Sequence, residues 1–294
     1  MKQIKKLLTF MLVVTGIIAM LVFTSSAVYE VDTWDELEIA LENPGTADIV
    51  LTGNIIRTVE NVFDSVSVKG VKTLDLNGHT VAYYDNVGKN DVDFTSHSNH
   101  DTLFNIGSSA ELTINDSSTT KIGTIIFDGW LANARSLKVI PIRDIFSIGG
   151  KLTVNGGYFS CGHEDDEWVT ALRLNGSLYT GYVNKQVYGT PLVVCYGGEL
   201  VVNDGGFIGR GGYYIKDKTN VTNYTGAAVY CSYGSKTTIN GGSFLGMGGA
   251  DIFCADSRAE ITVKSGTFKT KGIDKAIVRN KIFNCRIFID RHKF

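Results

Sequence analysis

The stretch LTVNGGYFS, which runs from Leu152 to Ser160, decides the fold because it recurs along the chain. Taken alone, its glycine pair between an asparagine and an aromatic residue resembles a loop that lets a backbone approach a phosphate. Close copies lie at 200–209 (LVVNDGGFIG), 237–246 (TTINGGSFLG) and 261–269 (ITVKSGTFK), and weaker copies begin at Leu74 and Leu112. A binding loop is needed once, whereas a phrase written several times is typical of a repeat architecture. We therefore interpret the stretch as a structural unit.

The copies are unevenly spaced, which separates a basic unit from its insertions. The intervals between turn residues are 40, 48, 37 and 24 residues, for the series Asn115, Asn155, Asn203, Asn240 and Lys264. The shortest interval sets the size of the unit, and the longer ones contain extra segments. These insertions follow the aromatic end of the phrase and fall at Asp85–Asp101, Asp128–Pro141, Ser160–Thr190 and Gly209–Gly226.

Each unit contains three short β segments. Two of them precede the turn residue, and a third follows it and ends in Phe159, Phe207, Phe244 or Phe268. Alternating apolar residues such as Leu152 and Val154 give each strand one inward side. Such a unit buries that side only by stacking on similar units. The sequence therefore predicts an all-β parallel β-helix, a solenoid, in which the phenylalanines form an internal ladder.

The N-terminal 27 residues have the pattern of a bacterial-type secretory signal peptide. A basic start is followed by an apolar run from Leu7 to Phe23, and Ser25-Ser26-Ala27 supplies the small residues of a cleavage site. An uncleaved membrane anchor is the alternative, since spans need roughly 17–25 residues. Cleavage after Ala27 would leave 267 of the 294 residues and change the net charge from −2 to −5. We expect a secreted or cell-surface protein, without a membrane span after cleavage and without the basic surplus of a nucleic-acid binder.

Residues 28–55 are predicted to form an N-terminal cap, and residues 56–294 the β-helix. The cap contains a short amphipathic helix from Trp34 to Leu41, with Thr33 or Asp32 as its N-cap, and a strand from Asp48 to Leu51. The repeats and this helix together resemble the pectate-lyase-like superfamily of right-handed parallel β-helix proteins, over roughly residues 30–280. The resemblance implies a right-handed coil and a helix that covers the open end of its core. At the other end, the sequence allows either a last irregular coil or a chain that is part of something longer.

The five cysteines are Cys161, Cys195, Cys231, Cys254 and Cys285, an odd number that excludes a fully paired internal framework. Three of them precede the turn residue of their unit by 8, 9 and 10 residues (Cys195, Cys231 and Cys254). We expect these three to stack at equivalent inward positions as buried thiols. A disulfide between neighbouring turns is the alternative.

The insertions enter at one corner of the unit, so stacking should gather them on one side of the solenoid, where function usually lies. They are rich in aromatic residues, and sugar rings stack on aromatic faces while acidic sugars pair with arginine. Packing of these rings onto the coil is the structural alternative. The predicted ligand-binding residues are Trp130, Trp168, Tyr179, Tyr182, Tyr213 and Tyr214.

The cluster CGHEDDEW, Cys161–Trp168, is the sharpest polar signal. Its acids Glu164, Asp165 and Asp166 could bind Ca²⁺ through oxygen ligands, although four adjacent acids are usually a solvated face. No other cofactor is expected. A carboxylate pair could also serve glycoside hydrolysis. The candidate catalytic residues are His163, Asp165, Asp166, Arg173 and Arg210.

The catalytic motifs of the resembling enzymes are not matched. Gly162-His163 is followed by Glu164 where polygalacturonase-like hydrolases have glycine, and Pro141 and Arg143 lack the leading arginine of pectate lyases. We therefore expect a non-catalytic, adhesin-like protein that binds a polysaccharide or a cell surface through its inserted loops. A polysaccharide lyase or glycoside hydrolase is the first alternative, and a structural spacer of a larger surface protein is the second.

Overall fold

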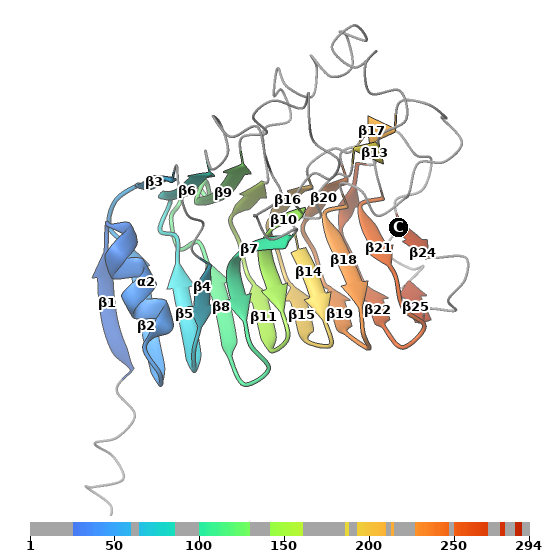
Figure 1. Cartoon of the computed structure of the whole chain (residues 1–294), viewed down its shortest axis with the longest axis horizontal. Coiled ribbons are helices and arrows are strands. Elements are labelled where there is room, and N and C mark those ends of the chain that lie inside the picture. The colour runs from blue at the N-terminus through green and yellow to red at the C-terminus, as the bar shows by residue number, and fades with distance from the viewer. Residues whose placement is uncertain are drawn as a thin grey trace, which may run out of the picture.

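The structure, a computed structural model, is a parallel β-solenoid with a single helix in its described part (Figure 1). It describes residues 26–59, 65–85, 100–129, 142–160, 186–187, 193–209, 213–214, 227–246, 250–269, 277–279 and 286–289. Three parallel sheets run along the stack, and the chain visits them in the repeating order C, A, B. The predicted all-β parallel architecture is confirmed.

Sheet A has nine described strands: β1 (Ala27–Val31), β2 (Thr46–Leu51), β5 (Val71–Asp75), β8 (Glu111–Asn115), β11 (Lys151–Val154), β15 (Glu199–Val202), β19 (Lys236–Ile239), β22 (Glu260–Val263) and β25 (Arg286–Ile289). Sheet B has seven: β3 (Ile55–Val59), β6 (Thr80–Asp85), β9 (Thr124–Gly129), β12 (Tyr158–Ser160), β16 (Gly206–Gly209), β20 (Ser243–Gly246) and β23 (Thr267–Phe268). Sheet C also has seven: β4 (Val66–Val68), β7 (His100–Ile106), β10 (Ile142–Ile148), β14 (Val193–Tyr196), β18 (Val229–Ser232), β21 (Ile252–Cys254) and β24 (Ile277–Arg279).

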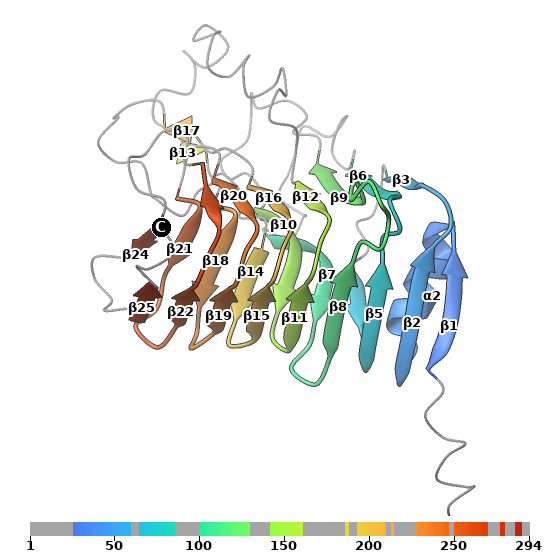
Figure 2. The same cartoon turned by 180° about the vertical axis from the view of Figure 1, so that it is seen from behind.

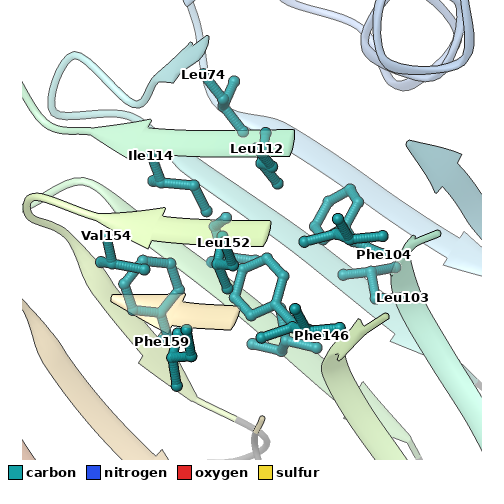
Figure 3. Close-up of a cluster of buried hydrophobic side chains, with 14 of the residues drawn as sticks. Leu74, Leu103, Phe104, Leu112, Ile114, Phe146, Leu152, Val154 and Phe159 are labelled. Atoms are coloured by element: carbon teal, nitrogen blue, oxygen red, sulfur yellow. The ribbon is translucent and has the colours of Figure 1, made fainter. Parts of the chain in front are cut away.

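The core lies between the three sheets and is built by in-register stacking. Leu152 of β11 pairs with Leu112 on one side and with Leu200 on the other, and all three side chains are buried. In Figure 3, Leu112 and Leu152 point toward Phe104 and Phe146 of sheet C. Because alternate residues of a strand face opposite sides, the alternation Leu-Thr-Val gives each strand one buried face.

The predicted phenylalanine ladder is confirmed. Ring centroids of Phe159 and Phe207 lie 5.0 Å apart, those of Phe207 and Phe244 5.0 Å, and those of Phe244 and Phe268 5.3 Å, with interplanar angles of 21°, 7° and 15°. The corner before these residues needs glycine at the second position after the turn asparagine, since Gly157 has φ +96° and Gly205 φ +120°. Such angles strain residues that carry a Cβ.

The turn asparagines form a second ladder. The Nδ2 group of Asn155 donates to Oδ1 of Asn115 at 2.8 Å, Asn203 donates to Asn155 at 2.7 Å, and Asn240 donates to Asn203 at 2.7 Å. A stacked amide can donate to one neighbour and accept from the other, which explains one asparagine per coil. The stretch LTVNGGYFS is therefore a structural unit, as predicted.

Helix α2 (Trp34–Glu42) lies at the N-terminal end of the stack (Figure 1). Thr33 is its N-cap, with Oγ1 accepting from the N–H of Glu36 at 3.4 Å. Leu37 and Leu41 are fully buried, and the Trp34 ring packs on Tyr83 with centroids 5.0 Å apart. The predicted capping helix is confirmed with one residue more. At the other end, β24 and β25 continue sheets C and A through a last described coil.

The four predicted insertions all join a sheet-B strand to the next sheet-C strand, as expected. One further insertion enters elsewhere. Residues 116–123 join β8 of sheet A to β9 of sheet B, where the coils that follow use three residues. Sequence analysis did not separate this segment from the longer interval between Asn115 and Asn155. The described part of the chain contains no helix that is long and apolar enough to cross a bilayer.

Candidate functional site

Two of the predicted loops meet. Strand β13 (Gln186–Val187) belongs to the insertion after β12, and β17 (Tyr213–Tyr214) belongs to the insertion after β16. They pair antiparallel, with Gln186 opposite Tyr214 and Val187 opposite Tyr213. These two insertions therefore meet at the paired strands, in agreement with the expected gathering of the insertions on one side.

The other predicted site residues lie outside the described residues, so the structure does not place them. These are the aromatic candidates Trp130, Trp168, Tyr179 and Tyr182, and the polar candidates His163, Glu164, Asp165, Asp166, Arg173 and Arg210. For Tyr213 and Tyr214 the structure gives the backbone pairing alone. The predicted catalytic, calcium-binding and loop-aromatic sites stay predictions.

A second aromatic group lies on the outer face of sheet C, over β14, β18 and β21, which stand side by side in Figure 1. We call it the tyrosine cluster. Tyr196 packs edge-on against Tyr233, with centroids 5.4 Å apart, and against Tyr230 at 6.5 Å. Tyr230 stacks on Phe253 at 5.7 Å and 23°. The cluster consists of Tyr196, Tyr230, Tyr233 and Phe253.

The strand alternation places these rings on the outside. Cys195, Cys231 and Cys254 pair in register on the inner face of sheet C and are buried, as predicted. Cys195 and Cys231 are free thiols, as predicted. The prediction of a third thiol at Cys254 is wrong, because Cys254 is disulfide-bonded. The residues directly beside these cysteines in the chain must face outward. They include Tyr196, Tyr230 and Phe253.

The cluster is graded from buried to exposed. Phe253 is buried and packs with Ala227 and Ala250, Tyr230 is partly buried, and Tyr196 and Tyr233 are 38% and 64% exposed. The inner rings therefore hold the outer ones in position. The two outer rings, Tyr196 and Tyr233, form an exposed aromatic surface on sheet C, which we call the aromatic ledge.

Tyr233 has an unusual backbone. Its φ is +51° in a tight turn before Gly234, and Ser235 N–H donates to the carbonyl of Ser232 at 3.0 Å. The left-handed region is costly for a bulky side chain, and residues held there often serve a function. Most turns of this kind use asparagine or glycine. The turn therefore carries a large exposed ring at a position where a small residue is favoured.

An ion pair adjoins this turn. Arg258 Nη2 lies 2.8 Å from Asp256 Oδ2, and Arg258 Nε donates to Oδ1 at 3.1 Å. The Arg258 side chain remains 68% exposed. Hydrogen bonds from the Arg258 side chain, and then from the backbone N–H groups of Arg258 and Tyr233, lower the pKa of Asp256 to about 2. A bidentate pair of this kind fixes the guanidinium plane beside the ledge.

The electrostatics suit binding of sugars. Burial, together with the nearby Tyr230, Asp144 and Tyr233, raises the pKa of Tyr196 to about 12. Its hydroxyl is protonated at neutral pH, as an unperturbed tyrosine hydroxyl also is. Exposed aromatic faces stack on sugar rings, and the exposed guanidinium can donate to hydroxyl or carboxylate groups.

In the described part of the chain, the carboxylate next to the Tyr233 turn is paired with an arginine. Glycoside hydrolysis uses two carboxyl groups, of which one starts protonated. Asp256 is the carboxylate beside the ledge, and its lowered pKa keeps it ionised and bound to Arg258. In the described ranges, no three His, Cys, Asp or Glu side chains are grouped so that they could hold a metal ion.

The residues of this surface were not among the predicted site residues, because all the predicted aromatic candidates belong to the insertions. They are Tyr196, Tyr230, Tyr233 and Arg258. A signal was present. When VVCYGG and VYCSYG are aligned on their cysteines, aromatic residues follow or flank each inward position. Once the cysteines were assigned to the inside, their neighbours could have been assigned to the outside.

Known proteins give no further guide to this surface. No family model, no curated sequence and no solved structure matches the chain.

Proposed function

We propose that the protein is a secreted or cell-surface binding protein that recognises a polysaccharide without degrading it. The observation that carries the proposal is the exposed Tyr196–Tyr233 ledge, supported from beneath by Tyr230 and flanked by Arg258. Aromatic faces on a rigid sheet bind sugar rings with little loss of side-chain entropy, since the rings are already held. The arginine favours a glycan that carries carboxylate or other anionic groups.

The location outside the cell rests on the sequence. The basic start, apolar run and small residues of the first 27 residues support secretion with cleavage after Ala27. A glycan ligand fits this location, because polysaccharides surround cells. The inserted loops, with Trp168 and the other predicted aromatic residues, would extend the binding surface beyond the ledge.

We also propose that the coil is right-handed and that the chain is a distant member of the pectate-lyase-like superfamily. Connections between parallel strands of one sheet are right-handed in about 98% of cases. The three-sheet coil, the N-terminal helix and the asparagine ladder support this assignment. A crystal structure with a left-handed coil would exclude it.

The first experiment is a glycan array probed with wild-type protein and with Tyr233→Ala and Arg258→Ala variants. We expect binding to polysaccharides that carry acidic sugars, weakened about tenfold by Tyr233→Ala, as expected for the loss of one ring contact. Arg258→Ala should reduce binding to acidic glycans more than to neutral ones. Tyr158→Ala is the matched control, since Tyr158 is 52% exposed on sheet B.

The same polysaccharides test the alternatives when they are incubated with the protein, with and without Ca²⁺. Release of reducing or unsaturated sugars would replace the proposal with a hydrolase or lyase. A loss of binding in Trp168→Ala but not in Tyr233→Ala would move the site to the insertions. If no glycan binds, the spacer function becomes the better hypothesis.

A further inference from the structure

The outer face of sheet A carries a row of alternating charges, which we call the charge row. One residue from each of six consecutive strands contributes to it, and each pairs in register with the next. All six side chains are exposed or half-buried. In stacking order they are Glu111, Lys151, Glu199, Lys236, Glu260 and Arg286.

Within one molecule, the alternation places an opposite charge on each adjacent strand, about 4.8 Å away. Arg286 and Glu260 show the direct form of this contact, with Nη1 2.9 Å from Oε1. Like charges at these positions would repel. The alternation therefore favours the correct stacking of coils.

The rest of the face consists mostly of short side chains. A second outward row lies two residues further along the same six strands and consists of Thr113, Thr153, Val201, Thr238, Thr262 and Phe288, of which Phe288 is 57% exposed. The asparagine ladder forms a third row. Figure 2 shows the sheet-A strands side by side as one continuous surface. Small side chains let a second sheet approach to about 10 Å, the usual distance between packed sheets.

Reversing the order of the charge row replaces each charge by its opposite, because the row has an even number of alternating charges. Two copies of the row are therefore complementary when one of them runs in the opposite direction. We propose that sheet A is a homodimer interface in which two copies pack face to face about a two-fold axis parallel to the strands. An axis between β15 and β19 places Glu199 opposite Lys236 of the second copy. It also places Lys151 opposite Glu260 and Glu111 opposite Arg286, so every facing pair has opposite charges.

The geometry selects this axis over others. A two-fold axis along the stack would reverse the strand direction and bring the charge row opposite the asparagine row. The axis parallel to the strands instead places opposite charges against each other along the whole charge row. In the second row it places Val201 opposite Thr238, Thr153 opposite Thr262 and Thr113 opposite Phe288 of the second copy. Packed sheets usually cross at about 30°, which separates the ends of two facing rows more than their centres. The central pair, Glu199 and Lys236, therefore matters most.

The size of the face predicts a weak, salt-sensitive dimer. Six strands at about 4.8 Å spacing and four residues at about 3.3 Å cover roughly 400 Å² on each copy, or about 800 Å² in total, which is below the range of stable specific interfaces and typical of a weak contact. Exposed charges are screened over about 10 Å at 0.1 M salt. The dimer should form at low ionic strength and dissociate as salt is added.

The test is sedimentation velocity of the full-length secreted protein and its charge variants at low ionic strength. Wild type should show a concentration-dependent dimer. Glu199→Lys or Lys236→Glu alone creates two like-charge contacts across the axis and should weaken the dimer about 30-fold. The double variant restores opposite charges at both contacts and should recover the dimer, although neighbours within its row now repel.

A mixture of the two single variants gives the sharpest result. E199K and K236E should each be monomeric alone but form a dimer together. The reason is that the E199K chain carries two central positive charges, which then face two central negative charges on the K236E chain. If circular dichroism shows that K236E is unfolded, Lys236→Gln takes its place, because it adds no repulsion within the row. A monomeric wild type at the highest soluble concentration, or single variants that dimerise like wild type, overturns the proposal.

Discussion

At the residue scale, Asp116 organises the only insertion of the described part of the chain that joins sheet A to sheet B. Its carboxylate is buried and accepts hydrogen bonds from Gly123 N–H at 2.8 Å, Gly78 N–H at 2.9 Å and Ser118 Oγ at 2.7 Å. Burial raises the pKa of Asp116, but hydrogen bonds from Ser118, Gly123 and Gly78 outweigh it, so the pKa lies below its ordinary value. A single carboxylate therefore ties two coils to the extra segment.

We expect Asp116→Asn to lower the free energy of unfolding by about 1–3 kcal/mol at pH 7, because an amide cannot accept from all these donors. A folded-state pKa below the unfolded value stabilises the protein above the unfolded pKa of about 3.9, and this stabilisation is lost as the pH falls through the folded value. The difference between wild type and variant should thus shrink below about pH 4. Urea unfolding at several pH values measures it, and a constant difference would contradict the assignment.

At the element scale, helix α2 depends on a residue from the next coil. The helix has Asp35 and Glu36 in its first turn but no basic residue in its last turn. The buried Lys72 of β5 supplies the positive charge, with Nζ donating to the carbonyls of Asn43 at 2.7 Å and Gly45 at 2.9 Å. Burial lowers the pKa of Lys72. The ammonium satisfies carbonyl groups beyond the helix end and complements the helix dipole.

We expect Lys72→Leu to lower the free energy of unfolding by about 2–3 kcal/mol, although leucine occupies this position in three later coils. The physical reason is that two buried carbonyl groups lose a charged donor. Amide hydrogen exchange in α2 should accelerate more than exchange in the central strands. Lys69→Leu is the matched control, since Lys69 is exposed and 3.8 Å from Glu42, and should change stability by less than about 1 kcal/mol.

At the scale of the whole molecule, each described coil contacts its neighbours, and one buried cluster fills the interior between the three sheets, with a second, small cluster of Ala227, Ala250 and Phe253 beside it. The phenylalanine ladder and the buried cysteines of sheet C run along the same interior. Burial raises the pKa of Cys195 to about 12 and also raises the pKa of Cys231. Both thiols are therefore protected by packing and by protonation.

We expect Cys195 and Cys231 to resist alkylation by iodoacetamide in the native protein and to react fully in concentrated guanidinium chloride. Mass spectrometry of the digested protein identifies each labelled cysteine separately. Phe207→Ala should speed labelling of Cys195, because loss of a buried phenyl ring costs about 3–5 kcal/mol and loosens the adjacent coils. Rapid labelling of either thiol in the native wild type would show that the interior is open.

Sequence patterns alone indicated the coil and its core. The repeated phrase predicted three strands per turn, the inward alternation, the phenylalanine ladder and the stacked cysteines, because each depends on spacing within one unit. The capping helix was also predicted, from Thr33 as its N-cap and from its amphipathic pattern. The charge row could also have been predicted, because a glutamate or a lysine precedes each aligned phrase in the sequence.

Only the three-dimensional structure shows which residues of different coils become neighbours. Tyr196 ends strand β14 and Tyr233 lies in the turn after β18, and their contact depends on the left-handed backbone of Tyr233. Lys72 occupies a position where later coils have leucine, and only the placement of α2 supplies its carbonyl partners. Periodicity determines which side of a strand is buried, because burial repeats with the pleat. Contacts between coils depend on register and turn geometry, and insertions of unequal length hide both from the linear sequence.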